Sequence, residues 1–367
     1  MSHDPANKFE LNYLEPNAIP SLIPSREFEK QLSLSANFSC IGCNKNQLLA
    51  QKWAIHIHAY YIEELAQLFD WLSGSVHGAI LIVTTDTVSK KQTIAWMIRE
   101  HVISKQLVDH RIIVGGNTGR NVSALAMHAI QEVESCDLVL HLHTKRSTHN
   151  SSLGESWFRD LVACLASSKM HVEEIRCAFA THQGLGIVIP RLTEGLRQFT
   201  NWGQNYNLAN MICSKSFTTK CLSMYSPLVF PAGMMFWFRP QAMRSFCLAY
   251  ESCLPLPSEP LAIDGTCLHA LERLVLHACE VDGYAWAISY PEQEHARDDQ
   301  HEPLRISVWE PRYEDYLNST TVLANSLRQT EKELGACKAY LSNRLRSPLK
   351  RFLQMFFSLF HRISPSN

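Results

Sequence analysis

The sequence predicts an α/β protein with a Rossmann-type, mostly parallel sheet, flanking helices and a helical extension at the C-terminus. In the first half, short apolar runs of strand length alternate with segments whose apolar residues recur at helical spacing. This alternation is typical of parallel strands joined by crossover helices. The composition agrees, because 46% of the 367 residues are hydrophobic and 19% are charged, as in a globular chain with a substantial core.

The first half supplies strands and the helices between them. Apolar runs with the length of buried strands lie at residues 51–58, 79–85, 111–114 and 137–143. Helical spacing of apolar residues predicts helices at 62–69, around 89–101 and over roughly 122–134. The glycines within 115–120 lack the spacing of a dinucleotide-binding fingerprint, so that class of cofactor is not expected.

The second half is more mixed. A helix is expected at 157–165, a buried strand at 186–190 and a strand-like aromatic run at 229–239. A further helix is expected at 264–279, with Asp264 as its N-cap. Residues 200–228 are expected to form a loop, and a last helix is expected at about 320–345.

These patterns divide the chain into an irregular N-terminal leader (1–50), an α/β domain (51–300) and a helical C-terminal extension (301–367). After Glu333 the chain has basic residues and no acidic ones, and apolar residues recur at helical spacing from Leu349 to Phe360. A basic, aromatic-rich amphipathic helix suits the surface of an anionic membrane, so residues 344–362 are expected to bind there. The alternative is that this helix docks on its own domain or on a partner subunit.

Charge and cysteine usage restrict the functional class and the expected cellular location. The balance of 34 Lys and Arg against 35 Asp and Glu gives no general electrostatic case for nucleic-acid binding. The start of the chain lacks a secretory signal pattern, and no run reaches the ~20 apolar residues of a membrane span. The 12 cysteines are scattered, and the lone pair Cys40 and Cys43 is interpreted as structural. A cytoplasmic location is therefore expected.

Polar side chains gather where the predicted strands end. His56, His58 and Tyr60 follow the first strand, Asn117, Arg120 and Asn121 follow the third, and His141, His143 and Lys145 follow the fourth. Ligands of open parallel sheets bind beyond the carboxyl ends of the strands, and alternation puts these histidines on one face. Imidazole, lysine and arginine donate to phosphate oxygens, so the pattern favours an anion site over buried core histidines. Zinc is not expected, because no carboxylate or cysteine nearby in sequence completes a site.

A second candidate region combines an aromatic run with a carboxylate. Gly233 interrupts the run 230–239, and a glycine in a strand often marks the close approach of another group. Asp264 is the best-placed lone carboxylate of the chain, although, taken by itself, simple helix capping is the favoured explanation. Glu272 and Arg273 form either a surface pair or a buried strut.

Several segments together resemble the rhamnan synthesis F family of bacterial polysaccharide glycosyltransferases. They are IHIHAYYIEEL (55–65), NTGRNVSAL (117–125), DLVLHLHTKRSTH (137–149), SWFRDLVACL (156–165), GIVIPR (186–191), AGMMFWFR (232–239) and DGTCLHALERL (264–274). The resemblance covers about residues 50–290. It implies a GT-A-like domain that transfers a sugar, a deoxyhexose such as rhamnose or another hexose, from a nucleotide sugar to a lipid-linked acceptor such as an O-antigen or capsule precursor.

Two departures from the family pattern matter. His141-Leu142-His143 stands where GT-A enzymes carry an Asp-x-Asp that holds a divalent metal. We therefore expect metal-independent transfer, in which Lys145, Arg120 and imidazolium neutralise the leaving diphosphate. Asn121 stands where the family usually has Asp, which removes a charged base or ribose-binding carboxylate at that position.

The resulting hypothesis is an inverting transfer with Asp264 as the general base. The donor nucleotide sugar is expected to bind to His56, His58, Tyr60, Asn117, Arg120, Asn121, His141, His143 and Lys145. The acceptor is expected to bind to Trp157, Arg159, Gly233, Phe236, Trp237, Arg239, His269, Glu272 and Arg273, with core packing as the alternative for the aromatic residues Phe236 and Trp237. Expected partners are the inner face of the cytoplasmic membrane and either a second copy or other polysaccharide-synthesis enzymes.

Two rival functions remain from the sequence. The first is a non-catalytic carbohydrate-binding or scaffold subunit of a polysaccharide assembly complex, an alternative that the Asn121 substitution keeps open. The second is a phosphate-ester hydrolase that uses the histidine cluster, with or without zinc. A scaffold turns over no nucleotide sugar, and a hydrolase needs no acceptor.

Overall fold

The computed structural model describes residues 26–34, 43, 45–145, 151–193, 200–217, 222 and 228–291. All of them lie in the first of the chain's two compact units, Met1–Ile306. The expected helix at 320–345, the basic segment 344–362 and Cys40 lie outside the described residues. None of the helices in the described ranges is long and apolar enough to cross a membrane.

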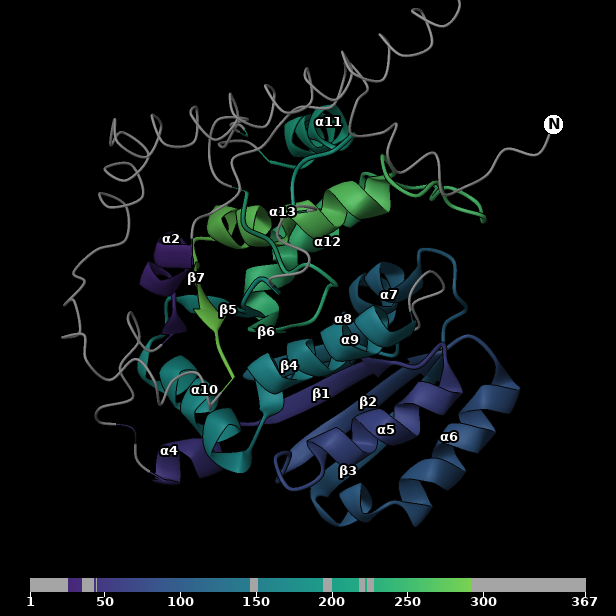
Figure 1. The fold of residues 1–367 in the computed structure, drawn as a ribbon, viewed down its shortest axis with the longest axis vertical. Helices are drawn as coiled ribbons and strands as arrows, with labels where there is room; N and C mark the ends of the chain where they lie inside the picture. Colours follow the sequence, from purple (N-terminus) through teal and green to yellow (C-terminus); the bar gives the residue numbers. More distant parts are fainter. Residues whose placement is uncertain are drawn as a thin grey trace, which may run out of the picture. The chain divides into compact units, whose positions relative to one another are not determined.

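The described residues form a seven-stranded sheet in the order β3-β2-β1-β4-β6-β5-β7 (Figure 1). Its strands are β1 Trp53–His58, β2 Ala79–Thr85, β3 Leu107–Val114, β4 Leu138–His143, β5 Leu185–Pro190, β6 Phe236–Phe238 and β7 Ala285–Ser289. Strand β1 is parallel to β2 and β4, β2 is parallel to β3, and β5 is parallel to β7. Only β6 runs against its neighbours β4 and β5 in this sheet. The predicted mostly parallel α/β sheet is thus confirmed.

Helices connect the strands and cover the sheet. They are α2 Arg26–Gln31, α4 Lys45–Ala50, α5 Ile62–Leu72, α6 Val88–Glu100, α7 Arg120–Ser123, α8 Ile130–Val133, α9 Ser151–Ala166, α10 Lys169–Thr181, α11 Tyr206–Ser216, α12 Arg244–Glu251 and α13 Cys267–Val281. Short segments η1 Val102–Lys105 and η4 Pro240–Met243 are 3-10 helical, and η2 Ala124–Ala129 is a π-helical stretch that joins α7 to α8. Figure 1 shows α5 and α6 over the part of the sheet formed by β1, β2 and β3.

One buried apolar cluster of the core lies on one face of the sheet. Alternate residues of β1, such as Ile55 and Ile57, share a buried cluster with Leu140 of β4 and with apolar residues of α5, α9 and α10. Helix α5 begins where its apolar residues start to recur at helical spacing, and Leu65, Leu68, Phe69 and Leu72 are all buried. Because strand side chains alternate, the opposite face of β1 and β4 carries the histidines.

Several sequence predictions need correction. Strand β3 begins earlier than expected, at Leu107, and the run 229–239 contributes only Phe236–Phe238 to the sheet. Residues 232–234 form a turn instead, with Gly233 at φ +91. The predicted loop 200–228 contains α11, and α13 begins at Cys267 rather than at Asp264. Part of the predicted leader is folded, because α2 and α4 are helical and Leu34 is buried.

Candidate functional site

The carboxyl ends of β1, β2 and β4 meet at one edge of the sheet because the three strands are parallel. The register pairs His56 with His141 and His58 with His143, so all four imidazoles project from one face. The rings of His56 and His141 stack with centroids 4.8 Å apart, and their Nδ1 atoms are 2.9 Å apart. The predicted gathering of histidines at the strand ends is therefore observed.

Hydrogen bonds extend this group to the neighbouring strand and to the loop after β3. The hydroxyl of Thr84 lies 2.9 Å from His56 Nε2 and 3.0 Å from His58 Nδ1. His58 Nε2 lies 3.3 Å from Asn117 Oδ1. Sequence analysis missed Thr84, which lies near the end of the β2 run, opposite His58 in a parallel pair.

Burial keeps these imidazoles neutral. It lowers the pKa of His58 and of His143 to about 4. Burial, followed by the neighbouring histidines, also lowers the pKa of His56 and His141 well below the usual histidine value. At neutral pH these rings are therefore neutral hydrogen-bonding groups in this structure. That imidazolium neutralises a leaving diphosphate stays a prediction.

Lys145 lies directly after this edge and is the cation closest to the histidines along the chain. Its Nζ is 3.8 Å from the centroid of the Trp157 ring on α9, a cation–π contact. Burial lowers the pKa of Lys145, and the carboxylate of Glu272 acts in the opposite direction. Lys145, Trp157 and Glu272, predicted separately from distant parts of the sequence, are therefore brought together.

The backbone of Gly233 forms hydrogen bonds with both His143 and Glu272, the carboxylate near Lys145. Its carbonyl accepts a hydrogen bond from His143 Nε2 at 2.7 Å, and its N–H donates to Glu272 Oε1 at 2.7 Å. A Cβ atom on Gly233 would lie 3.2 Å from Cζ2 of Trp157, and the φ of +91 disfavours any side chain. The close approach predicted from this glycine is confirmed.

Arg120 and Asn121 open α7 beside the site. Arg120 donates to both carboxylate oxygens of Glu259, at 2.8 and 3.0 Å, and this pairing raises the pKa of the arginine. Asn121 is half-buried in the first turn of α7. Tyr60, two residues after β1, lies under Lys90, with Nζ 4.2 Å from its ring centroid.

Asp264 occupies a loop and not the N-cap position, which belongs to Thr266. Its carboxylate accepts from the backbone N–H of Gln204 at 3.1 Å and from Asn205 Nδ2 at 2.6 Å. Arg273 Nη2 lies 3.7 Å away. The predicted capping role is wrong, and the side chain of Asp264 is held in place while 21% of it stays exposed.

Helix α13 carries the remaining polar residues of this region. Arg273 donates to the carbonyls of Asn201 and His269. Of the two alternatives from the sequence, a surface pair or a buried strut, Arg273 is therefore the buried strut. His269 Nδ1 pairs with the Thr266 hydroxyl at 2.8 Å. Burial lowers the pKa of His269, while the charges of Asp264 and Glu272 raise it, which places His269 within electrostatic reach of both carboxylates.

Two predicted acceptor-binding residues, Trp237 and Arg239, do not reach the site. Trp237 is 0% exposed, and its ring stacks 5.5 Å from that of Trp53 in the core. Phe236 is also 0% exposed, but it packs edge-on against His141 with ring centroids 5.6 Å apart. Arg239 follows the antiparallel strand β6, so it lies at the opposite edge and donates to Leu185 O at 2.8 Å. These side chains support the fold, whereas Arg159 is exposed on α9.

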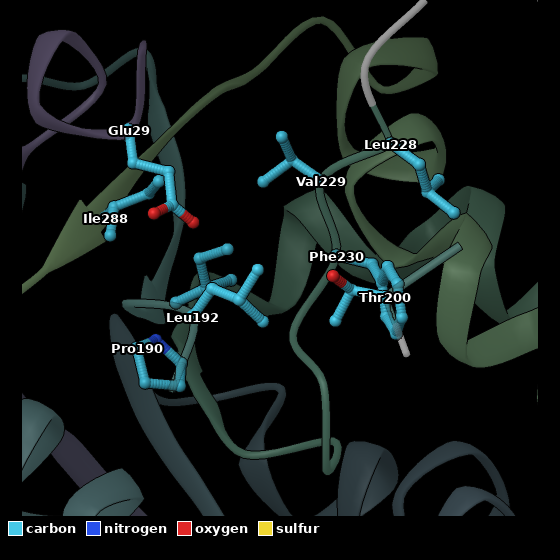
Figure 2. A pocket seen from close by; sticks show the side chains of 9 residues that line it. Glu29, Pro190, Leu192, Thr200, Leu228, Val229, Phe230 and Ile288 are labelled. Atoms are coloured by element: carbon cyan, nitrogen blue, oxygen red, sulfur yellow. The ribbon is translucent and has the colours of Figure 1, made fainter. Parts of the chain in front are cut away.

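A small pocket lies near the carboxyl ends of β5 and β7 (Figure 2). Pro190, Phe230 and Ile288 line it together with the Glu29 carboxylate of α2, which sequence analysis did not single out. Its volume of about 10 Å³ suits a single water molecule and not a sugar. Across the described part of the chain, no group of three or more His, Cys, Asp or Glu residues is arranged to hold a metal ion.

Comparison with known proteins identifies the family. The model of the rhamnan synthesis protein F family matches residues 28–284, from within α2 to the residue before β7. A relative from Xanthomonas campestris pv. campestris (strain B100), described as "Uncharacterized protein WxcX", is 28% identical over 222 residues. A protein of the same description from a second strain has the same identity and length of match. The match covers 60% of this chain and 30% of each relative, so the chain spans less than a third of their length. With most of its residues matched, including every residue of the site, this chain belongs to the rhamnan synthesis protein F family.

Proposed function

We propose that this protein is a glycosyltransferase of cell-surface polysaccharide synthesis. It moves a deoxyhexose such as rhamnose, or another hexose, from a nucleotide sugar to a lipid-linked glycan of the O-antigen or capsule type. The observation that supports this best is the cluster of polar groups at the carboxyl ends of β1, β2 and β4, where open α/β sheets bind ligands, in a chain of this family. The order of the sheet, with β6 alone antiparallel, is consistent with a GT-A-like plan.

On the donor side, the neutral groups and the cations have different tasks. Asn117 and His143 belong to a hydrogen-bonded framework at the sheet edge and orient the ligand. Lys145 and Arg120 supply positive charge to the leaving diphosphate, and Arg120 must exchange its carboxylate partner Glu259 for the ligand to do so. Neither task needs a charged imidazole.

On the acceptor side, Asp264 is the proposed general base. Its carboxylate is already oriented by Gln204 and Asn205 and is partly exposed, which suits proton removal from an acceptor hydroxyl. The hydroxyl oxygen then attacks the anomeric carbon as the bond to the diphosphate breaks, and the nucleoside diphosphate leaves with that electron pair. Trp157, beside Lys145, offers an aromatic face to a sugar. The segment 344–362, outside the described residues, is proposed to hold the enzyme at the inner face of the cytoplasmic membrane.

The test is turnover of dTDP-, UDP-, GDP- and CMP-linked sugars with a lipid-linked acceptor extract. Asp264→Asn is expected to lower kcat about a hundredfold or more, as for loss of a general base, without weakening nucleotide binding. Asp109→Asn, on the exposed edge strand β3, is the matched control and should keep full activity. Full activity of Asp264→Asn would remove Asp264 from this role, and nucleotide release without an acceptor would favour a phosphate-ester hydrolase.

A non-catalytic carbohydrate-binding subunit is the second candidate. Asn121 in place of the usual Asp favours it, as does the pairing of Arg120 with Glu259 in the absence of ligand. Binding of a glycan with no nucleotide release from any donor would support this function over transfer.

A further inference from the structure

A continuous chain of hydrogen bonds runs through the face of the sheet that carries the histidines. It passes from His141 to His56 (2.9 Å), from His56 to Thr84 (2.9 Å), from Thr84 to His58 (3.0 Å) and from His58 to Asn117 (3.3 Å). His56, His141 and Thr84 are at most 1% exposed, whereas Asn117 at the far end is partly exposed. We refer to this chain of five side chains as the relay.

The chemistry at Asn117 sets the direction of the relay. The carboxamide oxygen Oδ1 only accepts hydrogen bonds, so His58 Nε2 must carry the proton. A neutral imidazole has one N–H, so His58 Nδ1 accepts from the Thr84 hydroxyl. The Thr84 oxygen in turn accepts from His56 Nε2.

The other end of the relay agrees with this direction. With its proton on Nε2, His56 accepts at Nδ1 from the Nδ1–H of His141. His141 Nε2 is then an unprotonated acceptor, and it is buried without a hydrogen-bond partner in the described part of the structure. The opposite direction would bury an unpaired N–H donor at this atom. The lowered pKa values of the three histidines keep each ring in the neutral form that the relay requires.

We propose that the relay fixes the Asn117 carboxamide with its oxygen on His58 and its NH2 group directed away from the sheet, as a donor to an oxygen atom of the bound nucleotide. Thr84 is then a positioning residue, because it transmits the orientation without touching the ligand. No described residue accepts from Asn117 Nδ2, so both of its N–H groups are available. The identity of the ligand rests on the proposed function, whereas the direction of the relay does not.

The direction is tested first, in the wild-type protein without ligand. Long-range ¹H–¹⁵N spectra of ¹⁵N-histidine-labelled protein distinguish the two neutral tautomers. We expect His56 and His58 as Nε2–H tautomers and His141 as the Nδ1–H tautomer. The reverse pattern would overturn the proposal, since Asn117 would then turn its oxygen toward the ligand, and charged rings at neutral pH would overturn it as well.

The positioning role is tested by nucleotide binding, measured by calorimetry with dTDP, UDP, GDP and CMP. Thr84→Val removes the hydroxyl at nearly constant volume and should weaken binding about five- to tenfold, as for loss of one hydrogen bond. Thr84→Ser keeps the hydroxyl and should bind within about twofold of wild type. Thr85→Val is the matched control, because Thr85 is equally buried but donates to Ala59 O, outside the relay.

A double-mutant cycle connects Thr84 to Asn117. If Thr84 acts only through Asn117, then Thr84→Val should add no further loss to Asn117→Ala. Repeating the comparison with the nucleoside alone and with inorganic diphosphate shows whether the accepting oxygen belongs to the nucleoside or to a phosphate, and either result supports the proposal. Additive losses, or an equal loss in Thr85→Val, would overturn it. If wild-type protein binds none of these probes, the ligand assignment and the proposed function both fail, and the tautomers alone decide whether the relay exists.

Discussion

Acidification should destabilise this protein through its buried histidines, well above the pH at which most carboxylates take up protons. His58 and His143 have a pKa of about 4 in the folded chain, against the usual value of 6.5. The unfolded chain therefore binds protons first as the pH falls. Stability is full above pH 6.5 and is lost progressively between pH 6.5 and 4.

The magnitude follows from the shifts. Inside this window, each of the two groups lowers the protein's free energy of unfolding by about 1.4 kcal/mol for every pH unit of acidification. At pH 5, His58 and His143 together account for a loss of about 4 kcal/mol, over about 1.5 pH units below the unfolded pKa. The lowered pKa values of His56 and His141 act in the same direction. Because a typical folded domain is stable by about 5–15 kcal/mol, the effect should be large in an equilibrium measurement.

The assay is urea unfolding monitored by tryptophan fluorescence at several pH values from about 7.5 to 5, with the m-value checked for constancy. His143→Gln keeps a side-chain donor for Gly233 O but cannot titrate, so it should reduce the slope by about 1.4 kcal/mol per pH unit. His110→Gln, on the exposed strand β3, is the matched control and should leave the slope unchanged. A free energy of unfolding that stays constant from pH 7 to 5 would refute the burial argument.

Two further predictions concern the loops around the site. Glu259→Gln should change the free energy of unfolding by less than about 1 kcal/mol, because the Glu259–Arg120 pair is half exposed. The same substitution should tighten nucleotide binding, because it releases Arg120. Calorimetry at two salt concentrations measures this binding, and unchanged or weaker binding would contradict the prediction. Gly233→Ala should lower the free energy of unfolding by about 1–3 kcal/mol, because φ is +91 and the new methyl group meets Trp157. In the control Gly184→Ala the new methyl group has open space, so the free energy of unfolding, measured in urea, should stay within about 0.5 kcal/mol of wild type. Equal stability of the two glycine variants would contradict the strain argument.

The gathering of polar groups at the carboxyl ends of β1, β2 and β4 was predictable from the sequence because strand geometry alone determines it. Alternation places His56 and His58 on one face, and parallel pairing brings β1, β2 and β4 to the same edge. No detail of packing is needed for that inference. Thr84 follows from the same rule, since it pairs with His58 in the register of β1 and β2. A lone threonine in an apolar run is also typical of an ordinary strand, so it gave no distinct signal.

The surroundings of Asp264 and of the run 230–239 were less predictable because they depend on how distant segments meet. The direction of β6 decides that Arg239 lies at the opposite edge and that Trp237 enters the core. Asp264 is held by Gln204 and Asn205, which lie in a segment expected to be loop. The protonation of the histidines also escapes sequence analysis, because it depends on how completely the helices bury them.

Because the histidines are neutral, transfer without a metal ion would depend on the positive charges of Lys145 and Arg120. Among the predicted donor-binding residues these two carry the positive charge, and Arg120 is already paired with Glu259. If transfer is metal-independent, Lys145 must supply much of the charge stabilisation of the leaving diphosphate. Lys145→Gln should then lower kcat roughly a hundredfold or more, whereas Lys91→Gln on the exposed face of α6 should have no effect, and EDTA should leave both wild-type and control rates unchanged. Loss of wild-type turnover in EDTA, restored by Mg²⁺ or Mn²⁺, would show instead that a cation neutralises the diphosphate and that the histidines at the end of β4 do not replace it.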